Sequence, residues 1–264
     1  MASPTIQFVA VPELFRKIDT TTGDALVVQN VSEQDCIKIV DQRKKEKRHF
    51  RIKRYYSQSR ILIITIPTRI HERLHLCLYG RIYSAVEAMG LGFDWGPDGS
   101  TTLRPTRGPN RDGGEGDTTA GPASRASSDW PTLVIEAGYT QSMDNLRNDM
   151  RWWFSASGHE VKIVLLIKTE ANSGHIIIEN WHEVPAAQRQ GATTTRAAPT
   201  LLEPSRSQLI TINRGSNSAP PTVLSGPLRL DFELLFLRAA GQGEGDIVVS
   251  IANLQRMAQF IWAA

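Results

Sequence analysis

The sequence predicts an α/β fold in which helices flank a mixed sheet. Residues 130–168 read as a buried strand, an amphipathic helix and a second buried strand, about the size of one crossover between parallel strands. Residues 68–89 place apolar side chains along one helical stripe. Residues 228–237 alternate apolar and polar side chains, as a half-buried strand does. Together these segments predict a domain that combines a sheet with helices.

The composition of the chain narrows its class. Of its 264 residues, 41% are apolar and 22% charged, as in ordinary globular proteins. No apolar run approaches the roughly 20 residues of a membrane span, and we expect no secretory signal at the N-terminus. Cys36 and Cys77 lie far apart and are expected to be free thiols of a cytoplasmic or nuclear protein. A net charge of +3 is too small to indicate nucleic-acid binding by itself.

Residues 1–60 predict a β-rich N-terminal extension, because short apolar stretches alternate there with turn residues. The extension contains the densest positive charge of the chain, RKKEKRHFRIKR at residues 43–54. Such a run can contact phosphates or direct nuclear import, and it can equally be a solvated turn that leads into a strand. The strand predicted at residues 61–66 ends at Pro67 and opens the main domain, residues 61–264.

The predicted helix at residues 68–89 begins with the sequence HERLH. This places His71 and His75 one turn apart with Glu72 between them, which is the zinc-protease pattern. The alternative is that both histidines are hydrogen-bonded core residues, because they lie at the edge of the apolar stripe. The same helix offers only Glu87 as a further ligand, so zinc is the less favoured cation.

Two loose regions, about residues 92–129 and 185–227, interrupt the main domain and are rich in glycine, proline and short polar residues. Further elements are predicted within and after them. These are strands at residues 101–103, 175–179 and 207–213, the second of them paired with residues 161–167, and a last helix at residues 250–262.

The first loose region leads into the strand that ends at Glu136, and it supplies a second acid, Asp117. Two such carboxylates can hold Mg²⁺ or Mn²⁺, which brings a phosphate and an attacking water together. Two plainer alternatives stay open. Glu136 could pair with Arg147 of the following helix, and Asp117 could be a solvated loop residue.

The main domain contains seven fragments that, taken together, indicate a family: IPTRIHERLH, GSTTLRP, GEGDTTAGP, WPTLVIEAG, LRNDMRWWF, VKIVLLIK and FELLFLRAAGQGEGDIVVSIANL. Their order and spacing resemble the fungal branch of the restriction-endonuclease-like, PD-(D/E)XK fold proteins. This branch is allied to a large bacterial family classed as restriction endonucleases. The resemblance covers roughly residues 61–262 and rests on the whole series, because no single fragment is specific.

The resemblance implies a helix followed by a mixed sheet, with metal-binding acids at Asp117 and Glu136. It also implies that Glu72 on the first helix could orient a metal-bound water. In the family pattern a lysine two residues after the second acid assists the attacking water, and here that residue is Gly138. In the bacterial relatives a lysine on the next helix takes over, but residues 146–153 offer only arginines.

The function that follows is a metal-dependent nuclease that hydrolyses phosphodiester bonds of DNA or RNA with Mg²⁺ or Mn²⁺. Asp117 and Glu136 would hold the ion. Lys162 or Arg147 would assist the phosphate or the water, and residues 43–54 would contact the nucleic-acid backbone.

Two other functions stay open. The nuclease fold could be retained as a catalytically inactive binding or scaffold protein. Alternatively, the chain could be an enzyme that acts on a small molecule through His71, Glu72 and His75, because a fold does not determine a function. Association into a homo-oligomer also stays open, and no membrane partner is expected.

Overall fold

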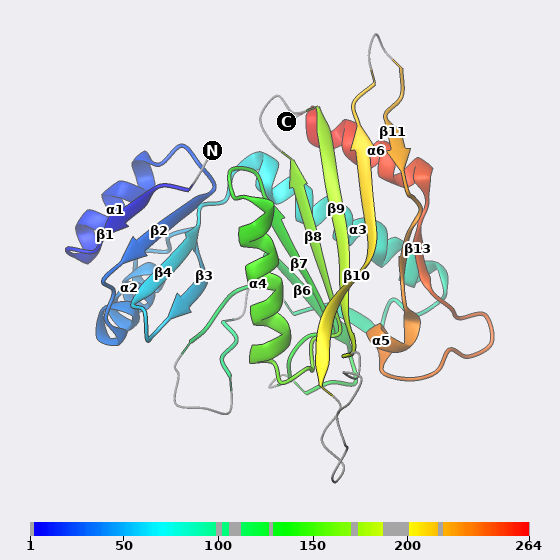
Figure 1. The fold of residues 1–264 in the computed structure, drawn as a ribbon, viewed down its shortest axis with the longest axis horizontal. Coiled ribbons are helices and arrows are strands. Elements are labelled where there is room, and N and C mark those ends of the chain that lie inside the picture. Colours follow the sequence, from blue (N-terminus) through cyan, green and yellow to red (C-terminus); the bar gives the residue numbers. More distant parts are fainter. Residues whose placement is uncertain are drawn as a thin grey trace, which may run out of the picture.

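Two α/β units, each with its own main sheet, make up the protein (Figure 1). The computed structural model describes residues 3–98, 102–105, 112–126, 129–169, 174–186, 201–215 and 219–263. Within these residues a four-stranded sheet forms the N-terminal unit, and a seven-stranded sheet with an additional two-stranded ribbon forms the larger unit. No helix in the described ranges is long and apolar enough to cross a membrane.

The N-terminal unit is an α/β layer, where the sequence predicts a β-rich extension. Its elements are β1 (Thr5–Gln7), α1 (Val11–Thr20), β2 (Ala25–Gln29), α2 (Glu33–Lys45), β3 (Arg51–Tyr56) and β4 (Ile61–Thr65). The apolar residues Leu14, Phe15 and Ile18 of α1 lie on one helical face and are buried. The boundary predicted at residue 60 falls inside this sheet, because β4 pairs with both β2 and β3 and buries Leu62 and Ile64.

The larger unit is built on a mixed sheet with the strand order β11-β10-β9-β8-β7-β6-β5. These strands are β5 (Trp95–Pro97), β6 (Thr118–Pro122), β7 (Leu133–Gly138), β8 (Ile163–Thr169), β9 (His175–Pro185), β10 (Leu202–Asn213) and β11 (Thr222–Leu224). Strands β7 and β8 are parallel and are joined by α4 (Met143–Ala156), whereas β6 and β9 run antiparallel to them. The strand, helix, strand unit predicted at residues 130–168 is therefore confirmed.

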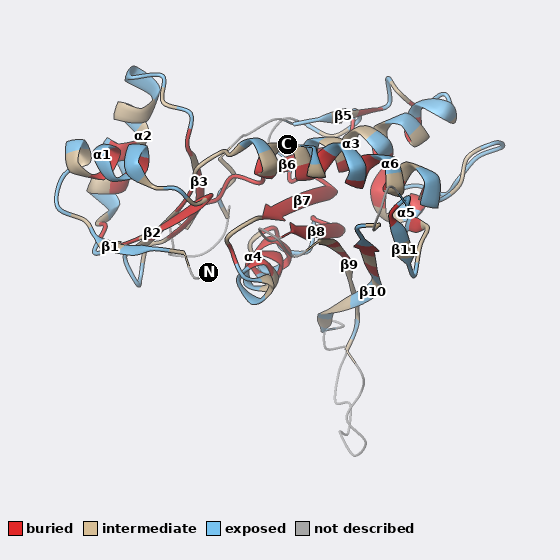
Figure 2. Ribbon diagram, turned by 90° about the horizontal axis from the view of Figure 1, so that it is seen from above, coloured by how far each residue is buried: buried red, intermediate tan, exposed pale blue. Residues whose placement is uncertain are grey.

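Helices cover both faces of this sheet. α3 (Arg69–Ala88) and α6 (Ile251–Trp262) lie on one face, and α4 lies on the other (Figure 2). α3 and α6 share one apolar cluster with the sheet, and α4 buries Trp153 against Val134 in another. Thr68, Ser142 and Ser250 cap the three helices, each accepting a hydrogen bond from the backbone N–H three residues later. These caps confirm the predicted helix starts.

Residues 228–237 form a short strand and a short helix, so the prediction of one continuous strand is wrong. β12 (Leu228–Leu230) pairs with β13 (Ile247–Val249). α5 (Phe232–Phe236) follows β12 directly. Asp231 ends the strand because its carboxylate accepts a hydrogen bond from the Leu234 N–H and caps the helix. The apolar residues after Asp231 therefore face the core at helical spacing.

The two loose regions contain more structure than their composition predicts. β5 and β6 lie in the first and form one edge of the large sheet, and all of β10 and β11 lie in the second. Leu103 forms an isolated bridge with Gly114. Thr101 of the strand predicted there lies outside the described residues, as do residues 187–200.

The helical face of α3 can be tested with two leucines that differ in burial. Leu78 is 0% exposed and Leu76 is 53% exposed. Leu78→Ala is expected to lower the free energy of unfolding by about 2 to 5 kcal/mol, because it leaves a cavity between α3 and the sheet. Leu76→Ala is expected to change it by about 0.5 kcal/mol or less. Urea unfolding of both variants measures this, and equal losses would contradict the packing.

Candidate functional site

Asp117 and Glu136, the two acids expected to act together, meet in one buried site. β6 pairs with β7 so that Thr118 lies opposite Ile135. Asp117 immediately precedes β6, and Glu136 is the next residue of β7. The Oδ2 atom of Asp117 accepts a hydrogen bond of 2.8 Å from the Ala137 N–H. Both carboxylates are at most 1% exposed. The alternative of a solvated loop residue at 117 is therefore wrong.

A lysine from the N-terminal unit lies among these acids. The Lys53 Nζ atom of β3 is 3.1 Å from Glu136 Oε2, 3.5 Å from Asp149 Oδ2 and 3.9 Å from Asp117 Oδ2. It also donates a hydrogen bond of 2.9 Å to Gln141 Oε1. Burial opposes the charge on this ammonium, but the surrounding carboxylates outweigh it and raise its pKa above the usual range.

The neighbouring residue, Arg54, reaches the same cluster. Its Nη2 atom donates a hydrogen bond of 3.2 Å to Glu136 Oε1, and its guanidinium lies 3.9 Å from the ring centre of Trp152. Successive side chains of a regular strand point to opposite faces. A bulge in the pairing of β3 with β4, between Ile52 and Arg54, breaks this alternation, so that Lys53 and Arg54 both face the acids.

The environment drives the pKa values of the two acids in opposite directions. Burial raises the pKa of Glu136, and the nearby Asp117 and Asp149 add to this rise, although Lys53 and Arg54 oppose it. For Asp117, burial is outweighed by the charges of His71 and Lys53, and its pKa falls well below its usual value. Paired titratable groups whose pKa values move apart are typical of sites that combine an acid with a base.

A second part of the cluster surrounds the histidines of α3. The Nδ1 atom of His71 lies 3.1 Å from Asp24 Oδ2, and its Nε2 atom lies 3.1 Å from Asp117 Oδ1. Burial opposes protonation of His71, but these two carboxylates raise its pKa to about 9. His75 is held through Nδ1 by the Thr118 hydroxyl at 2.7 Å. Both imidazoles are buried, as expected of core histidines.

Glu72 lies at the border between this cluster and the solvent. Its Oε1 atom is 3.3 Å from His75 Nε2, and its Oε2 atom accepts a hydrogen bond of 3.0 Å from Arg51. Burial opposes its ionisation, but His75 and Arg51 outweigh that cost and lower its pKa to about 2. The ligand atoms of His71, Glu72 and His75 all lie within 4.8 Å of one another, so this group could hold a metal ion.

A basic groove reaches the cluster at Glu72 and Arg51. It has a volume of about 500 Å³. Its charged lining residues are Arg43, Lys44, Lys47, Arg48, Arg51, Glu72 and Glu115. The run at residues 43–54 thus has two parts, because its first half lines this groove while Lys53 and Arg54 are buried.

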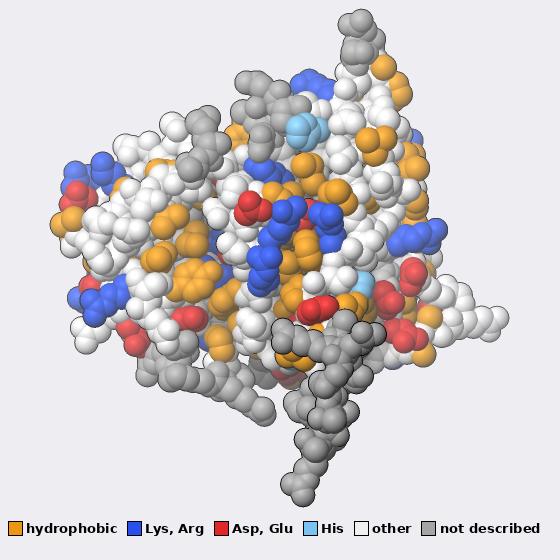
Figure 3. Space-filling model, in the orientation of Figure 1, with side chains coloured by type: hydrophobic (Ala, Val, Ile, Leu, Met, Phe, Trp, Pro, Cys, Tyr) orange, Lys and Arg blue, Asp and Glu red, His pale blue; other side chains and the backbone are white. Residues whose placement is uncertain are grey.

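Two residues expected to assist catalysis lie elsewhere. Arg147 donates a hydrogen bond of 2.6 Å to Glu179 rather than to Glu136, and Arg206 donates to the same acid. In Figure 3, Lys and Arg side chains gather over α4 and the strands beside it. Lys162 immediately precedes β8 and donates a hydrogen bond to the His159 carbonyl. It lies at the start of β8, whereas Glu136 lies beside Leu166, toward the other end of that strand.

At the position expected to carry the family lysine, a side chain would force Leu146 to shift. A Cβ atom at Gly138 would lie 2.9 Å from Leu146 Cδ1, in the core beneath α4. Sequence spacing pointed to lysines after Glu136, and it missed Lys53 because that residue precedes the acid by more than 80 positions. The only signal for Lys53 was its membership of the basic run.

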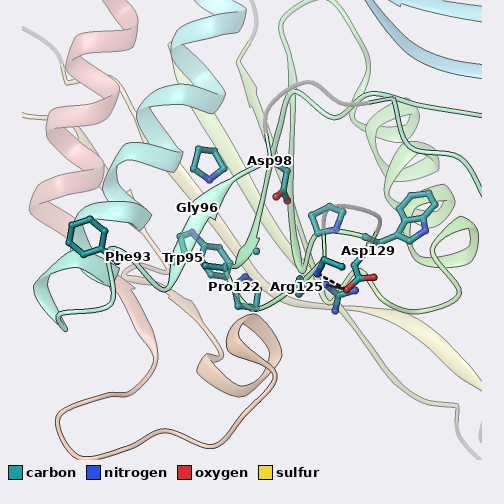
Figure 4. Close-up of a pocket in the computed structure, with 13 residues that line it drawn as sticks. Phe93, Trp95, Gly96, Asp98, Pro122, Arg125 and Asp129 are labelled. Carbon is teal, nitrogen blue, oxygen red and sulfur yellow. Dashed lines mark hydrogen bonds and ion pairs between the residues drawn. The ribbon is translucent and has the colours of Figure 1, made fainter.

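A further depression lies near the opposite end of β7 and is separate from the cluster (Figure 4). It has a volume of about 340 Å³ and contains two more acids of the first loose region, Asp98 and Asp129. Arg125 projects toward Asp129, 3.9 Å away, and also pairs with Glu160. Burial raises the pKa of Asp98. These acids therefore do not join Asp117 and Glu136.

The chain matches no model of a known protein family, and no curated protein matches it. Its function is accordingly inferred from the cluster itself. The distinguishing features are two buried acids on adjacent strands, a lysine from another unit between them, and a histidine group beside a basic groove.

Removal of the buried ammonium is expected to destabilise the fold. Lys53→Met should lower the free energy of unfolding by about 3 to 5 kcal/mol, because it leaves buried carboxylates without a compensating charge. Lys44→Met, at an exposed lysine of the groove, should change it by about 0.5 kcal/mol or less. Adding Glu136→Gln to Lys53→Met should restore part of the loss, because the two groups interact directly. Urea unfolding measures these variants and Glu136→Gln alone, and strictly additive effects of the two substitutions would contradict the pairing.

Proposed function

We propose that this chain is a restriction-endonuclease-like hydrolase of phosphodiester bonds in DNA or RNA. The observation that carries the proposal is the Lys53 ammonium, which lies 3.1 Å from Glu136 and 3.9 Å from Asp117. Two acids and a lysine are the groups that the family pattern combines. Here the lysine comes from a different segment, because Gly138 stands where the pattern has it. The order of helix α3 followed by a mixed sheet also supports the proposal.

The basic groove supplies the approach for a nucleic acid. Its exposed cations, Lys44 and Lys47, can neutralise phosphates without reading the sequence. Arg51 lies between the groove and the cluster, since its guanidinium reaches both Glu72 at 3.0 Å and Asp117 at 3.3 Å. A phosphate bound in the groove would therefore lie next to the acids that the proposal assigns to catalysis.

The carboxylates offer oxygen ligands of the kind that Mg²⁺ and Mn²⁺ prefer. Between Asp117 and Glu136, however, Lys53 already takes the place of a cation, and a further ion does not fit beside it in this arrangement. We therefore derive no step through an ion between these two acids. Of the expected metal ligands, Glu72 and Asp117 have oxygen atoms on the histidine side of the cluster, where an ion could serve hydrolysis.

One observation favours a second candidate function, nucleic-acid binding without hydrolysis. Asp117 and Glu136 are at most 1% exposed, and Lys53 and Arg54 compensate their charge. A closed and neutralised site of this kind is also what a retained but inactive nuclease fold would contain. The two candidates differ in a single respect. The hydrolase would cleave the nucleic acid through the cluster, whereas the binding protein would leave the nucleic acid chemically unchanged.

Cleavage of plasmid and single-stranded DNA and RNA, with Mg²⁺, Mn²⁺ or a chelator, tests the hydrolase. Cation-dependent cleavage is expected, and Glu136→Gln should lower its rate by about 100-fold or more, the range for loss of a positioned acid or base. Glu179→Gln is a matched control, because Glu179 is equally buried and ion-paired but lies outside the cluster. Folded wild-type protein that cleaves none of these substrates, or equal rates for both variants, would favour the binding module.

The groove can be tested by the salt dependence of binding. For a labelled DNA duplex, the double variant Lys44→Ala, Lys47→Ala should bind more weakly at low salt. It should also lower the slope of log K against log salt by about 0.9 for each lost phosphate contact. Arg151→Ala, at an exposed arginine of α4, is the control for the basic face over that helix. A slope that changes only with Arg151→Ala would place the nucleic acid on that other face.

A further inference from the structure

Three buried side-chain atoms of α3 have no hydrogen-bond partner among the described residues and lie close together. They are His71 Nε2, Glu72 Oε1 and His75 Nε2. All three lie within 4.8 Å of one another. Buried polar atoms normally form hydrogen bonds, so three atoms at one place that have only ion-pair contacts require an explanation.

In each imidazole the outer nitrogen, Nδ1, has a partner, so that the inner nitrogen, Nε2, faces the other two atoms of this group. His71 Nδ1 lies 3.1 Å from Asp24 Oδ2, and the Asp24 carboxylate accepts hydrogen bonds from the backbone N–H groups of Tyr139 and Thr140. His75 Nδ1 lies 2.7 Å from the Thr118 hydroxyl. Metal-binding histidines almost always have such a partner on the second nitrogen, because it fixes the tautomer and the ring orientation.

Each inner nitrogen also has a carboxylate oxygen close by. Asp117 Oδ1 lies 3.1 Å from His71 Nε2, and Glu72 Oε1 lies 3.3 Å from His75 Nε2, yet neither His nitrogen is aligned for a hydrogen bond. Four ligands about 2.1 Å from a tetrahedral ion lie about 3.4 Å from each other. The contact between Glu72 and His75 is close to that separation. Arg51 holds the other oxygen of Glu72, which leaves Oε1 facing the histidines.

We propose that His71, His75 and Glu72, with a water as the fourth ligand, bind a transition-metal ion of the zinc class. Two imidazole nitrogens with one carboxylate oxygen suit Zn²⁺ better than Mg²⁺, which prefers an all-oxygen octahedron. In the zinc-protease pattern the glutamate is a base, whereas here it is a ligand. The Glu72 side chain is 30% exposed and borders the basic groove, which provides an entry path for the ion.

This metal site does not depend on the proposed hydrolysis. Glu136 and Lys53 lie on the other side of Asp117, whose Oδ2 atom faces Lys53 and whose Oδ1 atom faces His71. Binding of the ion therefore leaves the Lys53 ammonium in place.

The test uses the full chain stripped with a chelator and then titrated with Zn²⁺ by calorimetry, and with Co²⁺ by visible absorption. We expect one ion per chain, four-coordinate Co²⁺ bands, and no displacement by millimolar Mg²⁺. His75→Gln should weaken Zn²⁺ binding by more than about 100-fold, beyond the 10-fold to 100-fold effect of an outer partner. Glu72→Gln removes a half-buried ligand, so it should fold like the wild type and still bind more weakly. His159→Gln, at an exposed histidine paired with Glu183, is the control and should bind normally.

Two results would overturn the proposal. One is a folded wild-type chain that binds no Zn²⁺ at micromolar concentration. The other is stoichiometric binding that Glu72→Gln and His75→Gln leave unchanged, which would place the ion elsewhere. Glu136→Gln separates this claim from the proposed hydrolysis, because it should retain Zn²⁺ binding even where it abolishes cleavage.

Discussion

The buried ammonium of Lys53 is the interaction on which the rest of the structure depends. Moving a charge out of water costs several kcal/mol, and Asp117, Glu136 and Asp149 each carry that cost inside the protein. Lys53 and Arg54 compensate these carboxylates only because a bulge in β3 directs consecutive side chains toward them. The strand β3 of the small unit thus completes the interior of the large one.

Directional polar contacts join the two units, beside an apolar contact in which Tyr56 of β3 packs against the cluster beneath α4. Each unit has its own apolar cluster. Between them, Arg43 donates two hydrogen bonds to Glu115, and Asp24 accepts hydrogen bonds from the backbone of residues 139 and 140. Charge-assisted hydrogen bonds tolerate little displacement, so they fix one unit on the other more narrowly than apolar contact would. This geometry brings β3 and α3 to the same carboxylates.

Asp117 divides the site into two chemically different halves. On one side lies a lysine that already neutralises Glu136, and on the other lie two histidines with inner nitrogens that lack hydrogen bonds. The histidine side therefore offers ligand atoms to a cation, whereas on the lysine side the Lys53 ammonium already neutralises the acid. The HERLH sequence and the acid pair, separate features along the chain, become parts of one site through a carboxylate that both share.

Local pattern by itself determined the helices that begin after Thr68 and Ser142, because caps and apolar periodicity are short-range features. The pairing of Asp117 with Glu136 depends on β6, which lies in a region that the sequence predicts to be a loose loop. Local pattern did not separate the strand from the helix around Asp231, since apolar spacing there fits both. Only the tertiary structure decided that Lys53 lies among the acids. The physical reason is that the ion pairs of β3 with Glu136 join segments more than 80 residues apart, and no local pattern records such contacts.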